Sequence, residues 1–586
     1  MVKLLRHTLF ISYICYPMMQ RWIYKPTPSE DVIDSISSSL GFGYLASKIL
    51  VMRGVDSYQK AREFFKPKAS DIHNPFLMAD MQKAVERIAT AIENGEKILV
   101  FGDYDVDGTT AVALMYLYLS KICDKKYLDF YIPDRNLEGY GVSTEGIDYA
   151  KENDFSLIIA LDCGIKSADK VDYANSLGVD FIICDHHLPG DEIPKATAVL
   201  DPKRKDCEYP YKDLSGCGVG YKLCQALNTI YKISDHELQD LTDLLAISIA
   251  ADIVPITGEN RVFAKMGLNK LRKTKRQGLK ILIPYEKLQN FTISNIVFEI
   301  APKINAAGRI SHGKAAVELM IAENAKQAHL IADQIVNLND ERKELDSNMT
   351  QQAIDQVIET KQEKTFSTIV YQSEWNKGVI GIVASRLIEL YYKPTLVFTD
   401  GTNGEMVASA RSVADFDLHN ALDVCSDLFL KFGGHRAAAG LSMEKKHFEA
   451  FKTKFEETVK NSIKEHQKTP SIEIDAEISL NDLTNDFFQF HRWLAPFGPE
   501  NMKPVLVVKN ARVSGHVRKI GKQSSHLKFN IVQDSSRKGI ECLAFKMGEH
   551  ATDFKTKTFD IAFTIEENHW KDNLTYYLNV RDVIFH

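Results

Sequence analysis

The sequence predicts an α/β protein whose first large domain is built on a parallel sheet. Three short apolar runs carry this prediction: KILVFGDYDVDG at 97–108, SLIIALDCG at 156–164 and DFIICDHH at 180–187. Each is too short for an independent helix, rich in Ile, Val, Leu or Phe, and bounded by Gly or Asp, which is typical of a buried parallel strand. Helix-like segments such as DGTTAVALMYLYLSK at 107–121 lie between them, in the order of βαβ units.

Acidic and histidine side chains follow each of these runs. They are Asp103, Asp105 and Asp107 in the first run, Asp162 in the second, and Asp185, His186 and His187 in the third. A fourth run, LTDLLAISIAADIVP at 241–255, places Asp252 after a helix-like apolar stretch. Because working groups gather beyond the carboxyl ends of strands in open α/β sheets, we expect these side chains to share one crevice.

So many carboxylates cannot stay ionised at close range without cations, because like charges raise one another's pKa. Carboxylates with few histidines favour Mg²⁺ or Mn²⁺ over a thiolate zinc site. A lone DxDxD sequence is often only a loop, and a lone pair of histidines is common on surfaces. The conjunction of acid clusters at successive strand ends therefore carries the prediction of a metal site.

The rest of the chain divides into further domains. The predicted boundaries are 1–75 for a helical N-terminal segment, 76–265 for the metal domain, 266–362 for a helical connector, 363–467 for a second α/β domain and 468–586 for a C-terminal β-barrel. Within the connector, 313–362 lacks Pro and has apolar residues at three and four spacing, which predicts a long helix or a helix pair. The last domain alternates apolar and polar residues in five or so short runs, which indicates an OB-like barrel.

Composition sets the broad class. With 586 residues, 45% of them hydrophobic and 26% charged, the chain has the composition of a soluble protein, and its net charge of −6 shows no basic footprint over the whole protein. Nucleic-acid binding must therefore come from local basic patches. The nine cysteines are scattered without a CxxC pair, which suits reduced thiols in the cytoplasm.

The N-terminal residues allow two interpretations. The stretch MVKLLRHTLFISYICYPMM resembles a weak signal peptide, but it is short, Tyr-rich and without a small-residue cleavage site. We expect instead that residues 1–18 are an annotation extension and that translation starts at Met18 or Met19. No segment elsewhere is long enough to span a bilayer, so no membrane association is expected.

The acidic segments resemble a known family. GDYDVDGTTA, LDCG, CDHH and AADIVP are similar to the four motifs of the DHH phosphoesterase family. The chain also resembles the members of that family that are bacterial exonucleases on single-stranded DNA, at PKINAAGR (302–309), WNKGVIGIVASRL (375–387), ASARSVADFDLHNAL (408–422), FGGHRAAAG (432–440) and LAPFGPENMKPVL (494–506). The resemblance runs from about residue 20 to the C-terminus. It departs at Asn376, where many relatives have His.

The resemblance implies roles for the acidic cluster. Two ions, Mn²⁺ or Mg²⁺, would be held by Asp105, Asp107, Asp162, His186 and Asp252, with Asp162 as the bridge between them. Asp103 would be a further ligand or a supporting carboxylate, and Asp185 would orient the imidazoles. His187 would bind a metal or contact the scissile phosphate. Asn305 and Arg309, in the NAAGR sequence, would contact phosphate; Arg309 alone could form a surface salt bridge, but its place between glycine- and alanine-rich breaks favours the phosphate contact.

The second α/β domain and the barrel would hold the substrate. In FGGHRAAAG, Gly433 and Gly434 would open a helix-like segment whose N-terminus attracts anions, so that His435 touches the phosphate, with Ser409 and Arg411 beside it. In the barrel, cations interleaved with aromatic residues would track a single strand: Arg518, Lys519, Lys522, His526 and Lys528 with Phe529 and Trp570. A plain solvated barrel face remains the alternative.

The function implied by the resemblance is a metal-dependent 5′→3′ exonuclease that degrades single-stranded DNA to nucleotides in DNA repair and recombination. It would act as a cytoplasmic monomer with a helicase and a single-strand-binding protein as partners. Two alternatives stay open: a DHH phosphoesterase on short substrates, a class that typically lacks a long C-terminal barrel, and a non-catalytic DNA-binding scaffold, a class that has lost metal ligands.

Overall fold

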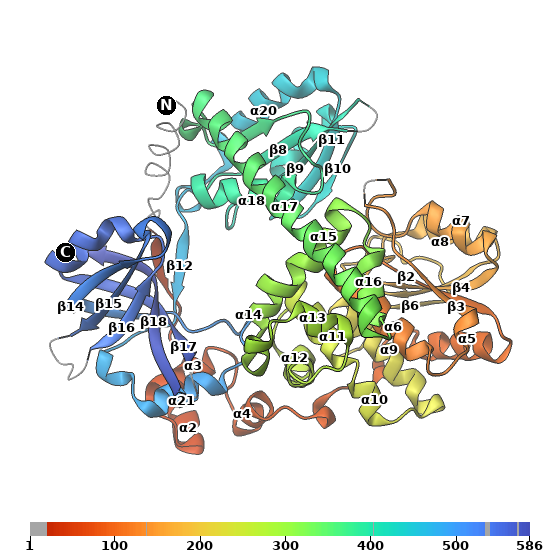
Figure 1. Ribbon diagram of the computed structural model, residues 1–586, viewed down its shortest axis with the longest axis horizontal. Coiled ribbons are helices and arrows are strands. Elements are labelled where there is room, and N and C mark those ends of the chain that lie inside the picture. Colours follow the sequence, from red (N-terminus) through yellow and green to blue (C-terminus); the bar gives the residue numbers. More distant parts are fainter. Residues whose placement is uncertain (1–19, 136, 402–403, 534–538, 571–572) are drawn as a thin grey trace. The chain divides into compact units, whose positions relative to one another are not determined.

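The computed structural model describes residues 20–586 except 136, 402–403, 534–538 and 571–572 (Figure 1). The chain forms two compact units. The first contains Arg62–Lys343 and Pro496–Met502, and the second contains Met1–Ala61, Glu344–Ala495 and Lys503–His586. The expectation that translation starts after residue 17 concerns residues outside the described part. Among the described residues, no helix has both the length and the apolar character needed to cross a membrane.

The first unit is built on the predicted parallel sheet. Its strand order is β3-β2-β4-β5-β6, and every neighbouring pair is parallel. The strands are β2 (Lys97–Gly102), β3 (Leu128–Tyr131), β4 (Phe155–Leu161), β5 (Asp180–Cys184) and β6 (Ala198–Leu200). The three runs singled out in the sequence are the three central strands, so the predicted fold class is confirmed for this domain.

Helices cover both faces of this sheet, which is why its strands are apolar on both sides. One core contains Val100 and Ile159 together with α5 (Met81–Glu93), α6 (Val106–Leu119) and α9 (Gly216–Tyr231). The opposite core contains Leu99 and Ile158 together with α7 (Thr144–Glu152) and α8 (Ala168–Ser176). Ser143 caps α7, because its side chain accepts a hydrogen bond from the N–H of Gly146.

A helical layer completes the first unit. It consists of α10 (Asp235–Gln239), α11 (Thr242–Ala251), α12 (Gly258–Leu271), α13 (Gln277–Leu282), α14 (Ile293–Asn295), α15 (Ala301–Ile310) and α16 (Lys314–Ile321). The 35-residue helix α17 (Ala325–Glu359) follows and continues into the second unit. Of the two alternatives predicted within 313–362, a long helix or a helix pair, the structure shows the pair, α16 and α17.

The second unit contains the second α/β fold. Its five-stranded sheet has the order β10-β11-β9-β8-β7, with β7 and β8 parallel and the remaining pairs antiparallel. The strands are β7 (Thr368–Tyr371), β8 (Thr395–Asp400), β9 (Met406–Arg411), β10 (Lys431–Gly434) and β11 (Ala438–Met443), and the helices are α18 (Ile380–Tyr391), α19 (Leu418–Asp423) and α20 (Phe448–Ser462).

The FGGHRAAAG segment is a β-hairpin, so the prediction of a helix opened by its glycines is wrong. Gly433 pairs with Gly440, and the N–H of His435 donates to the carbonyl of Ala438 across the turn. The Ala-rich run that favours a helix locally is instead recruited into the sheet by β9, where Ala438 pairs with Arg411. Pairing within a sheet outweighs the weak local preference for a helix.

The C-terminal domain is a closed barrel, as predicted. The order β13-β14-β15-β16-β18-β17 is closed by pairing of β14 with β17. The strands are β13 (Ala476–Glu477), β14 (Leu506–Ile520), β15 (His526–Val532), β16 (Ile540–Ala544), β17 (Phe559–Trp570) and β18 (Asn573–Phe585), with helices α21 (Asn485–Trp493) and α22 (Ala551–Thr556). Phe529 is buried, with its ring centroid 4.5 Å from that of Phe554, so its expected role in stacking DNA bases is wrong.

The N-terminal segment is largely helical, with α2 (Glu30–Leu40), α3 (Tyr44–Val51) and α4 (Tyr58–Phe65). It begins, however, with a strand that the sequence does not predict, β1 (Arg21–Tyr24). This strand pairs in parallel with β12 (Ser471–Ile474), and Trp22 packs on the same small core as Val507. The first described residues thus belong to the same unit as the barrel.

Candidate metal centre

The acidic side chains meet at the carboxyl end of the sheet. β2, β4 and β5 end at Gly102, Leu161 and Cys184, and the next residue in each case is an aspartate, Asp103, Asp162 and Asp185. Ligand atoms lie within 4.8 Å of one another in two overlapping groups: Asp162, His186 and His187 in one, and Asp107, His186 and Asp252 in the other. His186 belongs to both groups.

His186 lies at the middle of this cluster. Its Nε2 atom is 3.2 Å from Asp162 Oδ1, 3.6 Å from Asp252 Oδ2 and 3.9 Å from Asp107 Oδ2. Asp252 reaches the cluster from the C-terminal end of α11, where the sequence predicts it. Three elements that are far apart in the sequence therefore direct their side chains at one imidazole.

Asp107 is held by a set of donors that the sequence does not reveal. Its Oδ2 accepts from the N–H of Gly216 (2.7 Å), and its Oδ1 accepts from the N–H of Cys217 (2.9 Å) and the hydroxyl of Ser248 (2.7 Å). The N-terminus of α9 thus faces this carboxylate, and its N–H groups hold the carboxylate in place. A glycine-rich helix start, SGCGVG, and a serine inside the AISIAAD helix are the only sequence signals of this support.

Asp162 is the most constrained of the group. It has a positive φ of 60°, in the left-handed region where Asp is tolerated better than most residues. Gly216 lies against it: a Cβ at position 216 would stand 2.5 Å from both Asp162 Cβ and Oδ1. Backbone strain of this kind is typical of functional sites, where the surrounding structure maintains it.

Asp185 does not enter the cluster; it holds the imidazole of His187 and contacts His186 through the backbone N–H. One oxygen accepts from the N–H groups of His186 and His187 and lies 2.7 Å from His187 Nδ1, and the other accepts from Ile165 N–H. Burial would raise the pKa of Asp185, but these bonds lower it to about 2. The same ion pair raises the pKa of His187 despite its burial, and Nε2 of that ring lies 3.1 Å from the Tyr140 hydroxyl.

The pKa shifts and the unpartnered atoms of the cluster indicate a site for cations. Burial and then the neighbouring carboxylates raise the pKa of Asp105 and Asp162, and raise that of Asp252 to about 8. Burial lowers the pKa of His186, so its imidazole is neutral and can act as a ligand. Among the described residues, Asp162 Oδ1 and both ring nitrogens of His186 are buried without a hydrogen-bond partner. Buried lone pairs without partners among mutually repelling carboxylates fit divalent cations.

The structure places the two remaining acids of the GDYDVDG run at the edge of this cluster. Asp105 is the N-cap of α6 and accepts from the N–H of Gly108 (3.0 Å). Asp103 accepts from the N–H of Gly141 (3.3 Å), while its other oxygen is buried without a hydrogen bond. Burial and Asp105 raise the pKa of Asp103 well above its usual value, which fits a carboxyl that supports the site in its protonated form or serves as a further ligand.

Asn305 and Arg309 lie on α15, in the same unit as the metal centre. The charge of Arg309 acts on Tyr104, which stands inside the GDYDVDG run, and the Arg135 guanidinium lies 5.0 Å from the same ring. Burial nevertheless raises the pKa of Tyr104 to about 12. Two guanidinium groups thus act on the segment that carries the first three aspartates.

In the second unit, the residues expected to contact phosphate share one sheet. Ser409 and Arg411 lie on β9 beside the β10–β11 hairpin that carries Gly433, Gly434 and the exposed His435. Arg411 Nη1 donates to Ser409 Oγ (3.1 Å), and a Cβ at Gly381 would stand 3.0 Å from both side chains. The start of α18 therefore packs closely on this pair. Asn376 accepts from the N–H of Gly378 (2.8 Å) and so shapes the turn before α18.

The barrel residues expected to bind DNA occupy neighbouring strands. Arg518 on β14 pairs in register with Lys528 on β15, and Lys522 is exposed in the turn between them. Lys528 forms an ion pair with Glu541 (2.8 Å). Trp570 is the last residue of β17, and its side chain lies outside the described part of the structure.

Comparisons with known proteins agree with this architecture. The DHH family N-terminal domain matches residues 97–249, the DHHA1 domain matches 344–461 and the RecJ OB domain matches 474–582. Among curated proteins, the single-stranded-DNA-specific exonuclease RecJ of Bacillus subtilis is 39% identical over 90% of this chain and 66% of its own length. The RecJ of Salmonella typhimurium is 31% identical over 86% of this chain and 90% of its own length.

Solved structures agree as well. The crystal structure of Thermus thermophilus RecJ in complex with Mn²⁺ matches with a TM-score of 0.81 and 26% identity, over 96% of this chain and 79% of that chain. The matched parts include the parallel sheet with its acidic strand ends, the second α/β fold and the barrel. The chain therefore belongs to the RecJ family of DHH proteins.

Proposed function

We propose that this protein is a metal-dependent exonuclease that hydrolyses single-stranded DNA to nucleotides in the 5′→3′ direction, in DNA repair and recombination. One observation carries the chemistry: Asp107, Asp162, His186 and Asp252 converge on a buried site with unpartnered ligand atoms. The RecJ relatives, which are named as single-stranded-DNA-specific exonucleases, support the choice of substrate.

We assign the ligands of two ions, Mn²⁺ or Mg²⁺, to Asp105, Asp107, Asp162, His186 and Asp252. Asp162 would hold both ions, as the resemblance implies; its Oδ1 lies 3.2 Å from Nε2 of His186, the residue that the two groups of ligand atoms share. Bound ions of this kind neutralise the phosphate oxygens and make an attacking water more acidic near neutral pH. We assign Asp103 as a further ligand or as a carboxylate that supports the ligands.

The remaining work falls to residues of the chain itself. Asp185 holds the His187 imidazole through Nδ1, so a phosphate oxygen or an ion would meet Nε2, where it would replace the Tyr140 hydroxyl 3.1 Å away. In its phosphate-contacting role, the His187 ring would donate a hydrogen bond to charge that develops on the phosphate. Asn305 and Arg309 on α15 add hydrogen-bond donors to the substrate phosphates in this proposal.

The second unit binds the DNA strand. Arg411 and Ser409 offer a guanidinium and a hydroxyl beside the glycine-lined hairpin of Gly433 and Gly434, where the backbone can approach a phosphate closely, with His435 at the turn. On the barrel, Arg518, Lys522, Lys528 and Trp570 track the strand further from the cut. Exposed ion pairs contribute little, so a phosphate can displace Glu541 from Lys528.

The proposal extends to the setting of the enzyme. It acts as a cytoplasmic monomer, and a helicase and a single-strand-binding protein supply and protect its substrate. Two alternative functions have less support. An activity on short substrates leaves the match to the RecJ OB domain without a role. A non-catalytic scaffold leaves the buried ligand set without a role.

The test uses purified protein and oligonucleotides labelled separately at each end, with and without Mn²⁺. Release of nucleotides from the 5′ end only, and only with the metal, is expected. Asp162→Ala should abolish release while DNA binding persists, because a negative charge is removed from the site. Asp191→Ala, at an exposed aspartate, is the control and should keep wild-type rates. Digestion from the 3′ end, or one tenth of the wild-type rate in Asp162→Ala, contradicts the proposal.

A further inference from the structure

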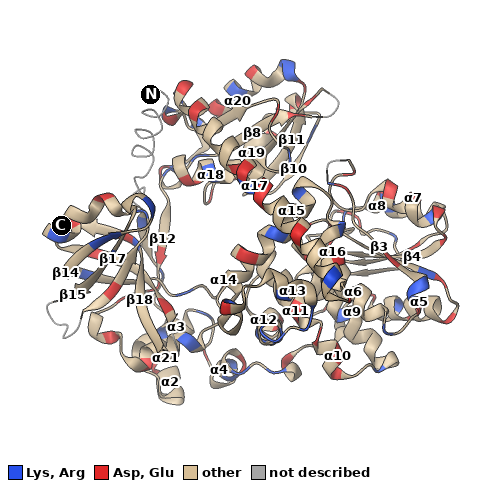
Figure 2. Cartoon of the chain, in the orientation of Figure 1, with Lys and Arg blue, Asp and Glu red and all other residues tan. Residues whose placement is uncertain are grey.

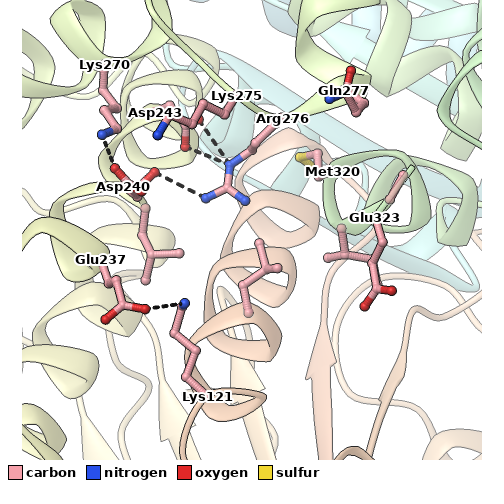
Figure 3. Close-up of a pocket in the computed structure, with 14 residues that line it drawn as sticks. Lys121, Glu237, Asp240, Asp243, Lys270, Lys275, Arg276, Gln277, Met320 and Glu323 are labelled. Atoms are coloured by element: carbon pink, nitrogen blue, oxygen red, sulfur yellow. Dashed lines mark hydrogen bonds and ion pairs between the residues drawn. The ribbon is translucent and has the colours of Figure 1, made fainter. Parts of the chain in front are cut away.

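A second pocket lies in the first unit, apart from the metal centre. Its volume is about 310 Å³, and it is lined by the end of α6 and by residues of α10, α11, α12, α13 and α16 (Figure 3). Helix α6 separates the two sites. Asp107 stands at its start and Leu117 lines the pocket ten residues later, which is about 15 Å along a helix.

A basic segment forms one wall of this pocket. Residues 270–280, KLRKTKRQGLK, contain six Lys or Arg residues and no acid. Lys270, Lys275 and Arg276 line the pocket, and Figure 2 shows stretches of ribbon near α12 in the blue of Lys and Arg. Burial and then the charges of Lys275 and Arg276 lower the pKa of Lys270, so the three cations act on one another at short range.

Arg276 is fixed at the centre of the group. Its Nε donates to both oxygens of Asp243 (2.9 and 3.0 Å), and its Nη2 donates to the carbonyl of Asp240 (3.2 Å). Asp243 is itself buried and accepts from Thr274 Oγ1 (2.8 Å), so the guanidinium is held rigidly. Its Nη1 makes no hydrogen bond to any residue that the structure describes.

The acids around the pocket already have partners. Glu237 pairs with Lys121 (2.8 Å), Asp240 with Lys270, Asp243 with Arg276, and Glu323 with Lys125. Lys275 is exposed and, within the described part of the chain, has no ion-pair partner. Four basic and four acidic residues line the pocket, and the cationic groups left without an acidic partner among the described residues are Lys275 Nζ and Arg276 Nη1.

The pocket also has an apolar side. Leu117, Leu241, Met320 and Ile321 line it together with the charged residues. Figure 3 shows Met320 on the side of Arg276 that lies away from Asp240 and Lys270. A ligand that fills this space therefore carries an anionic group at one end and an apolar or aromatic body at the other.

We propose that this pocket binds a small phosphorylated ligand of the nucleoside monophosphate class, with its phosphate on Arg276 and Lys275 and its base against the apolar residues. A guanidinium and an ammonium side by side suit a phosphate group. The volume is at the lower end of small-molecule pockets, which favours a mononucleotide over a length of nucleic acid.

The test is calorimetric titration of the full-length, metal-free protein with dAMP and, separately, with inorganic phosphate. Without ions the metal centre is rich in carboxylates and repels both ligands, and the loss of heat in a variant of Lys275 separates this pocket from the phosphate-binding residues proposed in the second unit. One dAMP should bind per chain, more tightly than inorganic phosphate. Lys275→Glu should weaken dAMP binding about tenfold or more, since it replaces a charge-assisted contact with a repulsive one.

Lys273→Glu is the matched control. Lys273 is exposed in the same basic segment but does not line the pocket, so its variant should bind dAMP within about twofold of wild type. Melting temperatures check the fold of both variants. Lys275 is substituted rather than Arg276, because loss of Arg276 leaves buried Asp243 with one donor fewer.

Three outcomes overturn the proposal: no binding of dAMP to the wild-type protein, equal weakening by Lys273→Glu and Lys275→Glu, or inorganic phosphate binding as tightly as dAMP. The second outcome indicates diffuse attraction to the basic segment, and the third shows that the apolar residues do not hold a base. Because binding is measured directly, the result is independent of whether the protein degrades DNA.

Discussion

Gly216→Ala tests the geometry of the metal centre without removing any proposed ligand. The added Cβ would stand 2.5 Å from Asp162 Cβ and Oδ1 and 2.8 Å from Asp162 Cα. An ordinary contact begins at 3.4 Å, so Asp162 or the start of α9 must move by about 0.9 Å, the difference between 3.4 and 2.5 Å. Since a misplacement of about 1 Å can cost about 100-fold in rate, we expect cleavage to fall about 100-fold.

The assay is steady-state cleavage of a 5′-labelled single strand with saturating Mn²⁺, together with the dissociation constant for the same DNA. The loss should appear in the rate, while DNA affinity changes little. Gly218→Ala is the matched control, two residues along the same helix, because the atoms nearest to its Cβ would be Ser215 Oγ at 3.3 Å and Leu214 Cβ at 3.4 Å. Both variants gain the same helix preference of alanine over glycine.

A rate for Gly216→Ala within about threefold of that for Gly218→Ala would refute the reasoning, because the close approach to Asp162 would then have no consequence for catalysis. Thermal melts separate this outcome from misfolding. A melting temperature that falls equally in both variants assigns the effect to α9 rather than to Asp162.

Four further predictions follow from contacts described above. Ser248→Ala removes a hydroxyl that donates to Asp107 and should raise the Mn²⁺ concentration for half-maximal activity about tenfold or more; an unchanged metal titration contradicts it. Mn²⁺ should raise the melting temperature of the wild-type protein but not of Asp162→Ala, as scanning calorimetry would show. Combined Arg518→Ala and Lys522→Ala should reduce the salt dependence of DNA binding by about 1.4 in log–log slope, at about 0.7 per phosphate contact; an unchanged slope removes both residues from the interface. Blunt duplex DNA should be digested far more slowly than single strands, and a 5′ single-stranded tail should restore digestion.

The sequence alone was sufficient for the sheet and for the residues at its carboxyl edge. An apolar run that ends in Asp or His predicts a buried strand and also the side chain at its carboxyl end. The positions of Asp103, Asp162 and Asp185 at the edge of the sheet could therefore be predicted from the local pattern. The residues that donate hydrogen bonds to the side chains of the site could not be predicted in this way. Ser248 and Gly216 contact Asp107 from 141 and 109 residues away, and only the folded helices bring them together.

The wrong predictions share one cause, the influence of distant neighbours on local pattern. The run of alanines after His435 favours a helix in isolation, but β9 supplies a partner and makes it a strand. Phe529 alternates correctly along its strand, yet the pattern cannot tell which face is the core, and Phe554 decides it. Strand β1 is only four residues long and has no local signal, because its partner β12 lies far along the chain.

That pairing of β1 with β12 has a consequence for synthesis of the chain. Arg21 pairs with Ser471, so the N-terminal strand waits for 450 further residues before its partner exists. At about 5–20 residues per second, this interval is about 20–90 s. Residues 62–343 form one continuous stretch and emerge within it, so most of the first unit can fold on the ribosome, completed by 496–502. The second unit closes last, and during that delay an apolar N-terminal end remains available to chaperones and proteases.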